Sequence, residues 1–176
     1  RDYHKAINRI NVAQYKQLVH GFHRAGISVF GGFIIGADQD DEETVADTAR
    51  VLGRMFDGIQ FRGFAHATVE TLAEYAGVPV WNGLTNEFHP TQVLADFLTM
   101  EEYGGGKLLK DMSFAFLGDA RHNMARSLLV GGAKMGMDVR MVGPEGYLPQ
   151  GQLLATCEKI AAETGARITI TSDLDA

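Results

Sequence analysis

The alternation of short apolar runs and amphipathic segments in the second half of the chain most constrains its fold. Runs rich in β-branched and aromatic residues occur at Ser113–Leu117, Val139–Val142 and Ile168–Thr171. Residues 123–135 and 152–163 lie between them and carry apolar side chains at helical spacing. Strands that alternate with helices predict a parallel sheet with right-handed crossovers. We therefore predict an α/β fold in which these three runs are adjacent parallel strands.

The first half of the chain predicts a second lobe of the same kind. Glycines Gly104–Gly106 bend freely and resist helix continuation, so we expect the two parallel-sheet lobes, each with flanking helices, to meet near Gly104. The expected helices are 11–25, 41–56 with Asp41 as its cap, 67–75 and 90–100, and the expected strands are 27–35, 58–61 and 78–81, with a loop over 82–88.

Net charge and cysteine content limit which classes of partner and of site the chain can have. The net charge of −6 argues against nucleic acid or an anionic membrane as a general partner. The longest apolar run, residues 26–37, is too short to span a bilayer, and no signal peptide precedes it. The single cysteine, Cys157, excludes an internal disulfide framework and a cysteine-rich metal site, and it fits a reducing cytoplasm. We read Cys157 as a small core residue and expect no metal site.

The run His89-Pro90-Thr91-Gln92 is the sharpest local signal. Proline suits the first position of a helix, where its missing N–H would be unpaired anyway. A helix start offers free N–H groups and partial positive charge, and His89 and Gln92 can face one small polar ligand. The alternative is a histidine at the start of an ordinary helix.

Two further positions follow predicted strands. Arg62 comes at the carboxyl end of the strand predicted at 58–61, where parallel sheets usually bind ligands, and an arginine there can hold a phosphate or carboxyl oxygen. It can equally be a surface arginine. The turn Gly118–Asn123 joins a strand to a helix but lacks the glycine spacing of dinucleotide-binding turns, so a simple connecting turn remains open.

Taken together, these segments resemble one family. Residues 49–63, ARVLGRMFDGIQFRG, are similar to the segment that follows the mobile phosphate-closing loop of ornithine carbamoyltransferases. Residues 81–92, WNGLTNEFHPTQ, resemble their carbamoyl-binding signature, and residues 118–124, GDARHNM, resemble the opening of their ornithine domain. The HPTQ element is shared with aspartate carbamoyltransferases, whereas the longer lead before it and the GDAR turn favour the ornithine branch. The resemblance runs from about residue 43 to residue 176, as an internal piece of such a protein.

The resemblance implies a site and a reaction. Arg62 and His89 would polarise the carbonyl of carbamoyl phosphate, Gln92 would hold the carbamoyl nitrogen, and Asn123 would bind the amino-acid end of L-ornithine. The δ-amine of ornithine would attack the carbonyl carbon and phosphate would leave, giving L-citrulline without a cofactor or a covalent enzyme intermediate. Positioning and fixed positive charge would carry the catalysis. The resemblance also implies a homotrimer.

The chain departs from the family pattern in its first part. The first phosphate loop of the family, Ser-x-Arg-Thr, does not occur in the sequence, and residues 38–42 are acidic except for Gln39, where the family has glutamine and lysine. Residues 15–43 instead resemble a strand–helix piece of radical S-adenosylmethionine proteins, but without their cysteine cluster motif. We expect residues 1–43 to be a foreign segment, 44–103 to be part of a carbamoyl-phosphate-binding domain, and 107–176 to start an ornithine-binding domain.

Three functions stay open at this stage. The first is ornithine carbamoyl transfer, with the chain itself expected to be inactive because of these departures. The second is a non-catalytic chimeric remnant that binds phosphate or carbamoyl phosphate weakly. The third is a radical S-adenosylmethionine fragment, which the single cysteine disfavours.

Overall fold

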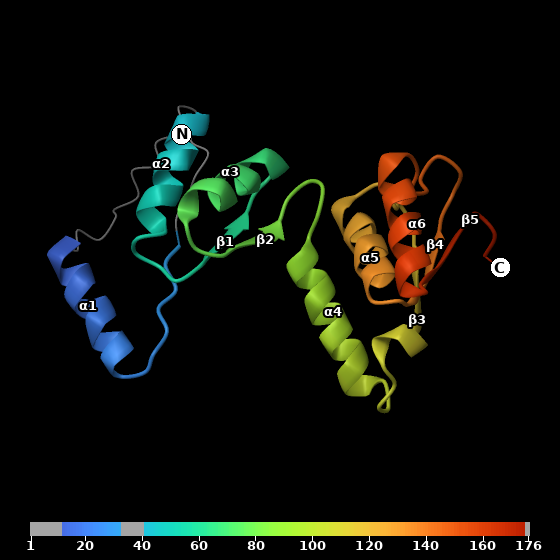
Figure 1. The fold of residues 1–176 in the computed structure, drawn as a ribbon, viewed down its shortest axis with the longest axis horizontal. Coiled ribbons are helices and arrows are strands. Elements are labelled where there is room, and N and C mark those ends of the chain that lie inside the picture. Colours follow the sequence, from blue (N-terminus) through green and yellow to red (C-terminus); the bar gives the residue numbers. More distant parts are fainter. Residues whose placement is uncertain (1–11, 33–40, 175–176) are drawn as a thin grey trace. The chain divides into compact units, whose positions relative to one another are not determined.

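The computed structural model describes residues 12–32 and 41–174, and the chain separates into two compact units, residues 1–39 and 40–176. The first unit contains helix α1, Val12–Arg24, close to the predicted helix (Figure 1). The helix ends where Gly26 adopts a left-handed conformation, φ +71°, and the N–H of Ile27 donates to the carbonyl of Phe22 at 2.9 Å. A glycine that can adopt positive φ is the usual helix terminator.

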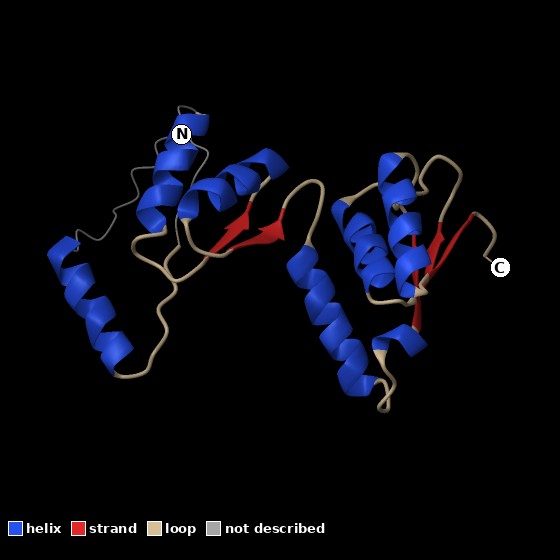
Figure 2. Ribbon diagram, viewed as in Figure 1, coloured by secondary structure: helices blue, strands red, loops and turns tan. Residues whose placement is uncertain are grey.

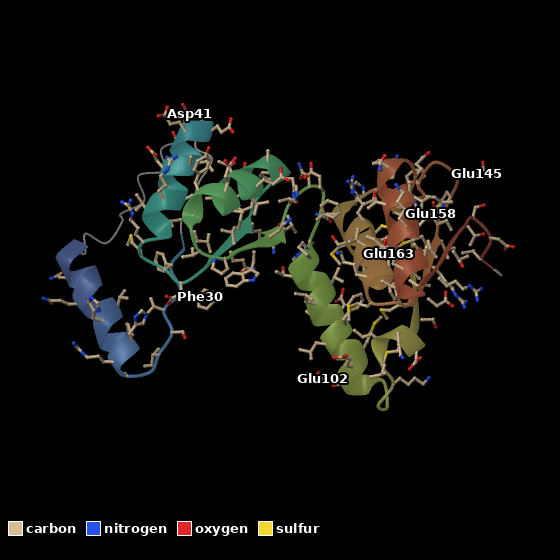
Figure 3. The ribbon with its side chains drawn as sticks, in the orientation of Figure 1. Phe30, Asp41, Glu102, Glu145, Glu158 and Glu163 are labelled. Atoms are coloured by element: carbon tan, nitrogen blue, oxygen red, sulfur yellow. The ribbon has the colours of Figure 1, made fainter. Side chains whose placement is uncertain are left out.

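The strand predicted after α1 is not formed in its described part. Residues 27–32 have no strand geometry, and residues 33–35 lie outside the described residues. The side chain of Phe30 is 94% exposed (Figure 3). The prediction for residues 27–32 is wrong because a β-branched and aromatic composition favours a strand only where a neighbouring strand pairs with its backbone and covers its side chains.

Helix α2, Glu42–Leu52, begins as its sequence predicts. Asp41 is the N-cap, and its carboxylate accepts from the backbone N–H of Thr44 at 2.8 Å and from its hydroxyl at 2.7 Å (Figure 3). The helix ends at Leu52, before the expected end at 56, and the chain turns at Gly53. A Cβ atom at Gly53 would clash with the carbonyl oxygen of Ala76, so a glycine permits the close approach of α2 to the end of α3.

A small parallel sheet follows α2 in the chain. Strand β1, Ile59–Arg62, pairs with β2, Val80–Leu84, and α3, His66–Ala76, connects them (Figure 2). Strand β2 reaches Leu84, so part of the expected loop over 82–88 is strand instead. The correction has a local cause, because pairing continues as far as Arg62 opposite Leu84, across a register shift between Phe61 and Arg62.

The second lobe confirms the strand–helix alternation. Its elements are β3 (Ser113–Leu117), α5 (Asn123–Lys134), β4 (Asp138–Val142), α6 (Gln152–Thr164) and β5 (Arg167–Thr171). The strands run parallel in the order β3-β4-β5, so the three predicted strands are adjacent. Val139 and Met141 on the central strand are fully buried, as is Cys157 on α6.

Helix α4, Pro90–Tyr103, runs past its predicted end and leads through Gly104 and the short 3-10 helix η1, Leu109–Asp111, into the second lobe. Val93 and Phe97 on α4 belong to the same apolar core as the buried residues of α5 and β4. A Cβ atom at Gly131 of α5 would meet Val93 at 2.7 Å, so a small residue there permits the helices to approach. Helix α4 therefore begins next to the first sheet and buries its apolar face against the second lobe.

Candidate functional site

The two strands of the first sheet end side by side. Arg62 is the last residue of β1 and is exposed, and its partner Leu84 is the last residue of β2. Beyond the ladder, the N–H of Gly63 donates to the carbonyl of Leu84 at 2.9 Å, and the N–H of Asn86 donates to the carbonyl of Phe64 at 2.8 Å. The segments that follow both strands therefore start from one edge of the sheet, as parallel pairing requires.

The segment from Thr85 to His89, here called the HP loop, is organised around a fully buried threonine. The hydroxyl of Thr85 accepts from the N–H of Phe88 at 3.2 Å and lies 3.0 Å from Nδ1 of His66. The amide of Asn82 donates to the same hydroxyl at 3.2 Å. These bonds connect β2, α3 and the loop, so the path of the chain into α4 is set by tertiary contacts.

His89 occupies the N-cap of α4, with Pro90 at the first helical position, as predicted. Its side chain does not cap the helix, and Nδ1 lies 3.4 Å from the hydroxyl of Thr91. Partial burial lowers the pKa of the imidazole below its usual value, the positive charge of Arg62 lowers it further, and the charge of Asp96 opposes both effects. Burial and the charge of Arg62 thus both favour the neutral form of His89.

Gln92 lies one helical turn after His89, on the exposed surface of α4. Its side-chain N–H donates to the carboxylate of Asp96 at 2.9 Å. Within the described part of the chain, no hydrogen bond joins the side chain of Gln92 to Arg62, His89 or Asn123, although its backbone N–H donates to the carbonyl of His89 at 3.2 Å. Because the amide nitrogen of Gln92 donates to Asp96, the amide oxygen is the atom of this side chain that can accept a hydrogen bond.

Asn123 begins α5 in the second lobe, and its side chain reaches the HP loop. The Nδ2 group donates to the carbonyl of Thr85 at 2.7 Å. One turn further along α5, the hydroxyl of Ser127 accepts from the backbone N–H of His89 at 2.7 Å and donates to the carbonyl of Asn123 at 2.7 Å. The structure thus brings Asn123 and His89 together through Ser127.

The turn before α5 is held by ion pairs between its own side chains. The carboxylate of Asp119 accepts from Nε and Nη2 of Arg121 at 2.9 and 2.8 Å and lies 3.1 Å from Nε2 of His122. The guanidinium of Arg121 also lies over the ring of Tyr147, 4.1 Å from its centroid. These hydrogen bonds from Arg121 hold the pKa of Asp119 well below its usual range. The arrangement favours a connecting turn over a phosphate-binding one.

Sequence reasoning missed the polar residues that hold the HP loop. Ser127, Thr85 and His66 were not singled out, although a serine among apolar residues on a buried helix face signals a required hydrogen-bond partner. The guanidinium of Arg126 lies 5.1 Å from the ring centroid of Phe88. Three buried atoms have no hydrogen-bond partner within the described residues: Oδ1 of Asn82, Oε2 of Glu87 and Nε of Arg126.

Other candidate chemistry finds no support in the described residues. They contain no group of three or more histidine, cysteine or acidic side chains that could hold a metal ion. Burial raises the pKa of the Cys157 thiol, as expected for a core residue and not for a nucleophile. Residues 12–32 and 41–174 include no helix long and apolar enough to cross a bilayer.

The strand edge, the helix start and α5 together form a candidate anion and carbonyl site. Arg62 supplies a permanent charge, and a neutral His89 can donate one hydrogen bond and accept another. Such groups suit an oxygen that gains negative charge during a reaction.

Comparison with protein-family models gives two matches in sequence order. Residues 21–102 match the model described as aspartate/ornithine carbamoyltransferase, carbamoyl-P binding domain, and residues 110–176 match the Asp/Orn binding domain of the same family. The first match begins at residue 21, within the stretch of 15–43 that resembles radical S-adenosylmethionine proteins. That second resemblance therefore stays a prediction from sequence.

Solved structures agree with the family models. The chain is 44% identical to ornithine carbamoyltransferase from Gloeobacter violaceus, with a TM-score of 0.65, over 80% of this chain and 46% of that one. For the enzyme from Pyrococcus furiosus the values are 41%, 0.70, 79% and 43%. An N-acetyl-L-ornithine transcarbamylase is 28% identical, with a TM-score of 0.67, over 82% of this chain and 47% of that one.

The chain thus spans less than half of the length of these structures. Its two matched segments fall on the two lobes in the order of the family's domains, and its parallel sheets with flanking helices agree with the family's α/β fold. On this basis, the chain belongs to the aspartate/ornithine carbamoyltransferase family.

Proposed function

We propose that the protein represented by this chain transfers the carbamoyl group of carbamoyl phosphate to L-ornithine, which yields L-citrulline and phosphate. The choice of ornithine over aspartate is supported by the solved ornithine carbamoyltransferases at 44% and 41% identity. The lead into His89 and the GDAR turn favour the same substrate. This reaction would place the protein in arginine metabolism.

In this proposal, Arg62 and His89 bind the carbonyl oxygen of carbamoyl phosphate. The guanidinium donates as a permanent cation. The proposal places the proton of the neutral imidazole on Nε2, while Nδ1 lies 3.4 Å from the Thr91 hydroxyl. That N–H donates to the carbonyl oxygen without requiring a second positive charge beside Arg62.

Gln92 and Asn123 complete the proposed site from its two sides. The amide oxygen of Gln92 accepts from the carbamoyl NH₂ group, since its amide nitrogen already donates to Asp96. Asn123 binds the amino-acid end of ornithine at the start of α5. Its Nδ2 group donates to Thr85, so its amide oxygen is the atom that faces a ligand donor.

The reaction follows from these positions. The lone pair of the neutral δ-amine attacks the carbonyl carbon, and negative charge builds on the oxygen held by Arg62 and His89. The bond from carbon to the phosphate oxygen then breaks, the electron pair leaves with phosphate, and the proton of the amine passes to the departing phosphate. Stabilisation of the oxyanion by fixed donors is the main contribution expected of the protein.

One observation carries the proposal: β1 and β2 end side by side at Arg62 and Leu84, and the chain leads from Leu84 through the HP loop to His89 at the start of α4. Calorimetric titration of the chain with carbamoyl phosphate tests it. We expect saturable binding that Arg62→Ala weakens by about tenfold or more, because a charge-assisted hydrogen bond is lost. Arg54→Ala removes an exposed arginine elsewhere in the first lobe and is the matched control. Equal affinity of both variants would overturn the assignment of Arg62.

We further propose that the chain alone turns over slowly. The Ser-x-Arg-Thr loop is missing from its sequence, and Asp41 of the acidic stretch is engaged in capping α2. Citrulline formation should lie more than about a hundredfold below that of an intact relative, because fixed donors around the phosphate are missing. Turnover within that range would contradict the proposal and exclude the rival reading of a binding-only remnant.

We also propose how the chain is divided and assembled. Residues 1–43, 44–103 and 107–176 form its three segments, the whole protein is a homotrimer, and it acts in the cytoplasm. Analytical ultracentrifugation of the chain tests the assembly, with a trimer expected and a concentration-independent monomer contradicting it for this chain.

A further inference from the structure

Ser127 is a buried polar residue in an otherwise apolar setting. Its exposed fraction is 5%, and the neighbouring buried positions on α5 include Ala125 and Leu129. Its hydroxyl makes two bonds of 2.7 Å, accepting from the N–H of His89 and donating to the carbonyl of Asn123. A hydroxyl that donates and accepts at once polarises both bonds, so the two interactions strengthen each other.

The backbone of His89 depends on this contact. Its φ and ψ, −137° and 65°, lie outside the helical region, and its own side chain does not cap α4. Pro90 fixes the next φ angle but provides no N–H donor. Among the described residues, the imidazole makes one hydrogen-bond contact, with the Thr91 hydroxyl at 3.4 Å. The main chain at His89 fixes the direction of the Cα–Cβ bond, and with it the place from which the ring extends.

The other end of the HP loop is held by the same turn of α5. Asn123 donates to the carbonyl of Thr85 at 2.7 Å, and its own carbonyl receives the Ser127 hydroxyl. Asn123 and Ser127 of α5 thus form hydrogen bonds with the first and last residues of the loop. The bonded residues are 38 positions apart in sequence in both cases, so these are tertiary contacts.

We propose that Ser127 is a positioning residue, which holds the backbone of His89 so that the imidazole faces carbamoyl phosphate and which ties the carbamoyl side of the site to the ornithine side. The inference rests on the proposed function. Ser127 need not touch either substrate. Ser127 positions the backbone of His89 by accepting from its N–H, and it positions the backbone of Asn123 by donating to its carbonyl.

Three substitutions in the full chain separate positioning from packing. Ser127→Ala removes the hydroxyl, Ser127→Cys keeps the volume but is a weak acceptor, and Ser127→Thr keeps the hydroxyl. Thr99→Ala is the matched control, because the Thr99 hydroxyl donates to Ala95 within α4 and is exposed. Far-UV circular dichroism checks that each variant is folded, and the cysteine variant replaces the alanine one if the latter does not fold.

Two readouts are measured on each variant. Amide hydrogen exchange at His89, followed by NMR, should accelerate by about tenfold or more in the alanine and cysteine variants, because the donor loses its acceptor. The dissociation constant for carbamoyl phosphate should rise by about tenfold in the same two variants. The threonine variant and Thr99→Ala should behave like the parent chain in both.

The outcomes decide between the explanations. Unchanged exchange at His89 in Ser127→Ala overturns the proposal, and so does a threonine variant that loses as much affinity as the alanine variant, since packing would then explain the effect. A parent chain that does not bind carbamoyl phosphate overturns the proposed function. In that case, faster exchange at His89, together with a shifted imidazole resonance, still supports positioning, and no change in either refutes it.

Discussion

The two sheets of this chain share a connectivity but differ in how well their strands are protected. In the second sheet, β4 has a parallel neighbour on each side, and its Val139 and Met141 are fully buried. In the first sheet, β1 and β2 each have one described neighbour, and Trp81 on β2 is 50% exposed. Two strands alone are marginally stable, whereas three with a covered face can be stable independently. The candidate ligand groups sit at the end of the weaker sheet and are held by a helix of the stronger lobe.

The largest expected effect comes from the core of the stronger lobe. Leu129 on α5 is fully buried, and Leu129→Ala should lower the free energy of unfolding by about 2–5 kcal/mol through lost burial and an unfilled cavity. Urea unfolding followed by circular dichroism measures the change. Leu98→Ala on α4, where the side chain is 56% exposed, should change it by less than about 0.5 kcal/mol. Similar losses in both variants would contradict the described core.

Hydrogen exchange tests the comparison of the sheets directly. Amides of β4 should exchange only through global unfolding, because both edges of the strand are paired. Amides of β1 and β2 should exchange faster, through local opening. The comparison fails if β1 and β4 amides report the same opening free energy under native conditions.

A smaller effect is expected from the carboxylate at the start of β4. Hydrogen bonding from Arg140, 2.9 Å away, lowers the pKa of Asp138, and the charges of Arg140 and Arg167 act in the same direction. The folded pKa lies below the unfolded value, so the contribution is present above the usual aspartate pKa and is lost as pH falls through the folded pKa. Because the pair is largely solvated, we expect about 0.2–1 kcal/mol.

Asp138→Asn should therefore flatten the dependence of unfolding free energy on pH in the acid range below the usual aspartate pKa. Asp57→Asn, which removes an exposed carboxylate of the first lobe, is the matched control for the loss of one negative charge. An unaltered acid profile in Asp138→Asn would show that the ion pair makes no net contribution.

The same contrast explains what could be predicted from sequence. Both ends of the strand Ser113–Leu117 were predicted correctly. The apolar run lies between a helix break and a glycine turn, and these two signals mark where the strand begins and ends. The strand expected at 27–35 failed over 27–32, since composition does not reveal whether a neighbouring strand is available. Helix α4 extends past its expected end at 100 to Tyr103, and it ends at Gly104, whose N–H donates to the carbonyl of Glu101.

The candidate site divides in a similar way. Arg62 and His89 could be identified from their places after predicted strands, and the resemblance added roles for Gln92 and Asn123. Ser127 could not be found by local pattern, because its partner His89 lies 38 positions away and is recognised only once α5 packs beside α4. A residue whose role is a backbone hydrogen bond leaves little trace in a motif.

The acid–base behaviour of His89 tests the central claim, that Arg62 and His89 share one site. NMR titration of the His89 imidazole gives its pKa in the parent chain, in Arg62→Ala and in Arg54→Ala. The account predicts a parent value below the ordinary 6.5, because burial and the charge of Arg62 disfavour protonation. Removal of that charge should raise the pKa in Arg62→Ala, while Arg54→Ala should match the parent chain. An identical pKa in all three proteins would contradict the account.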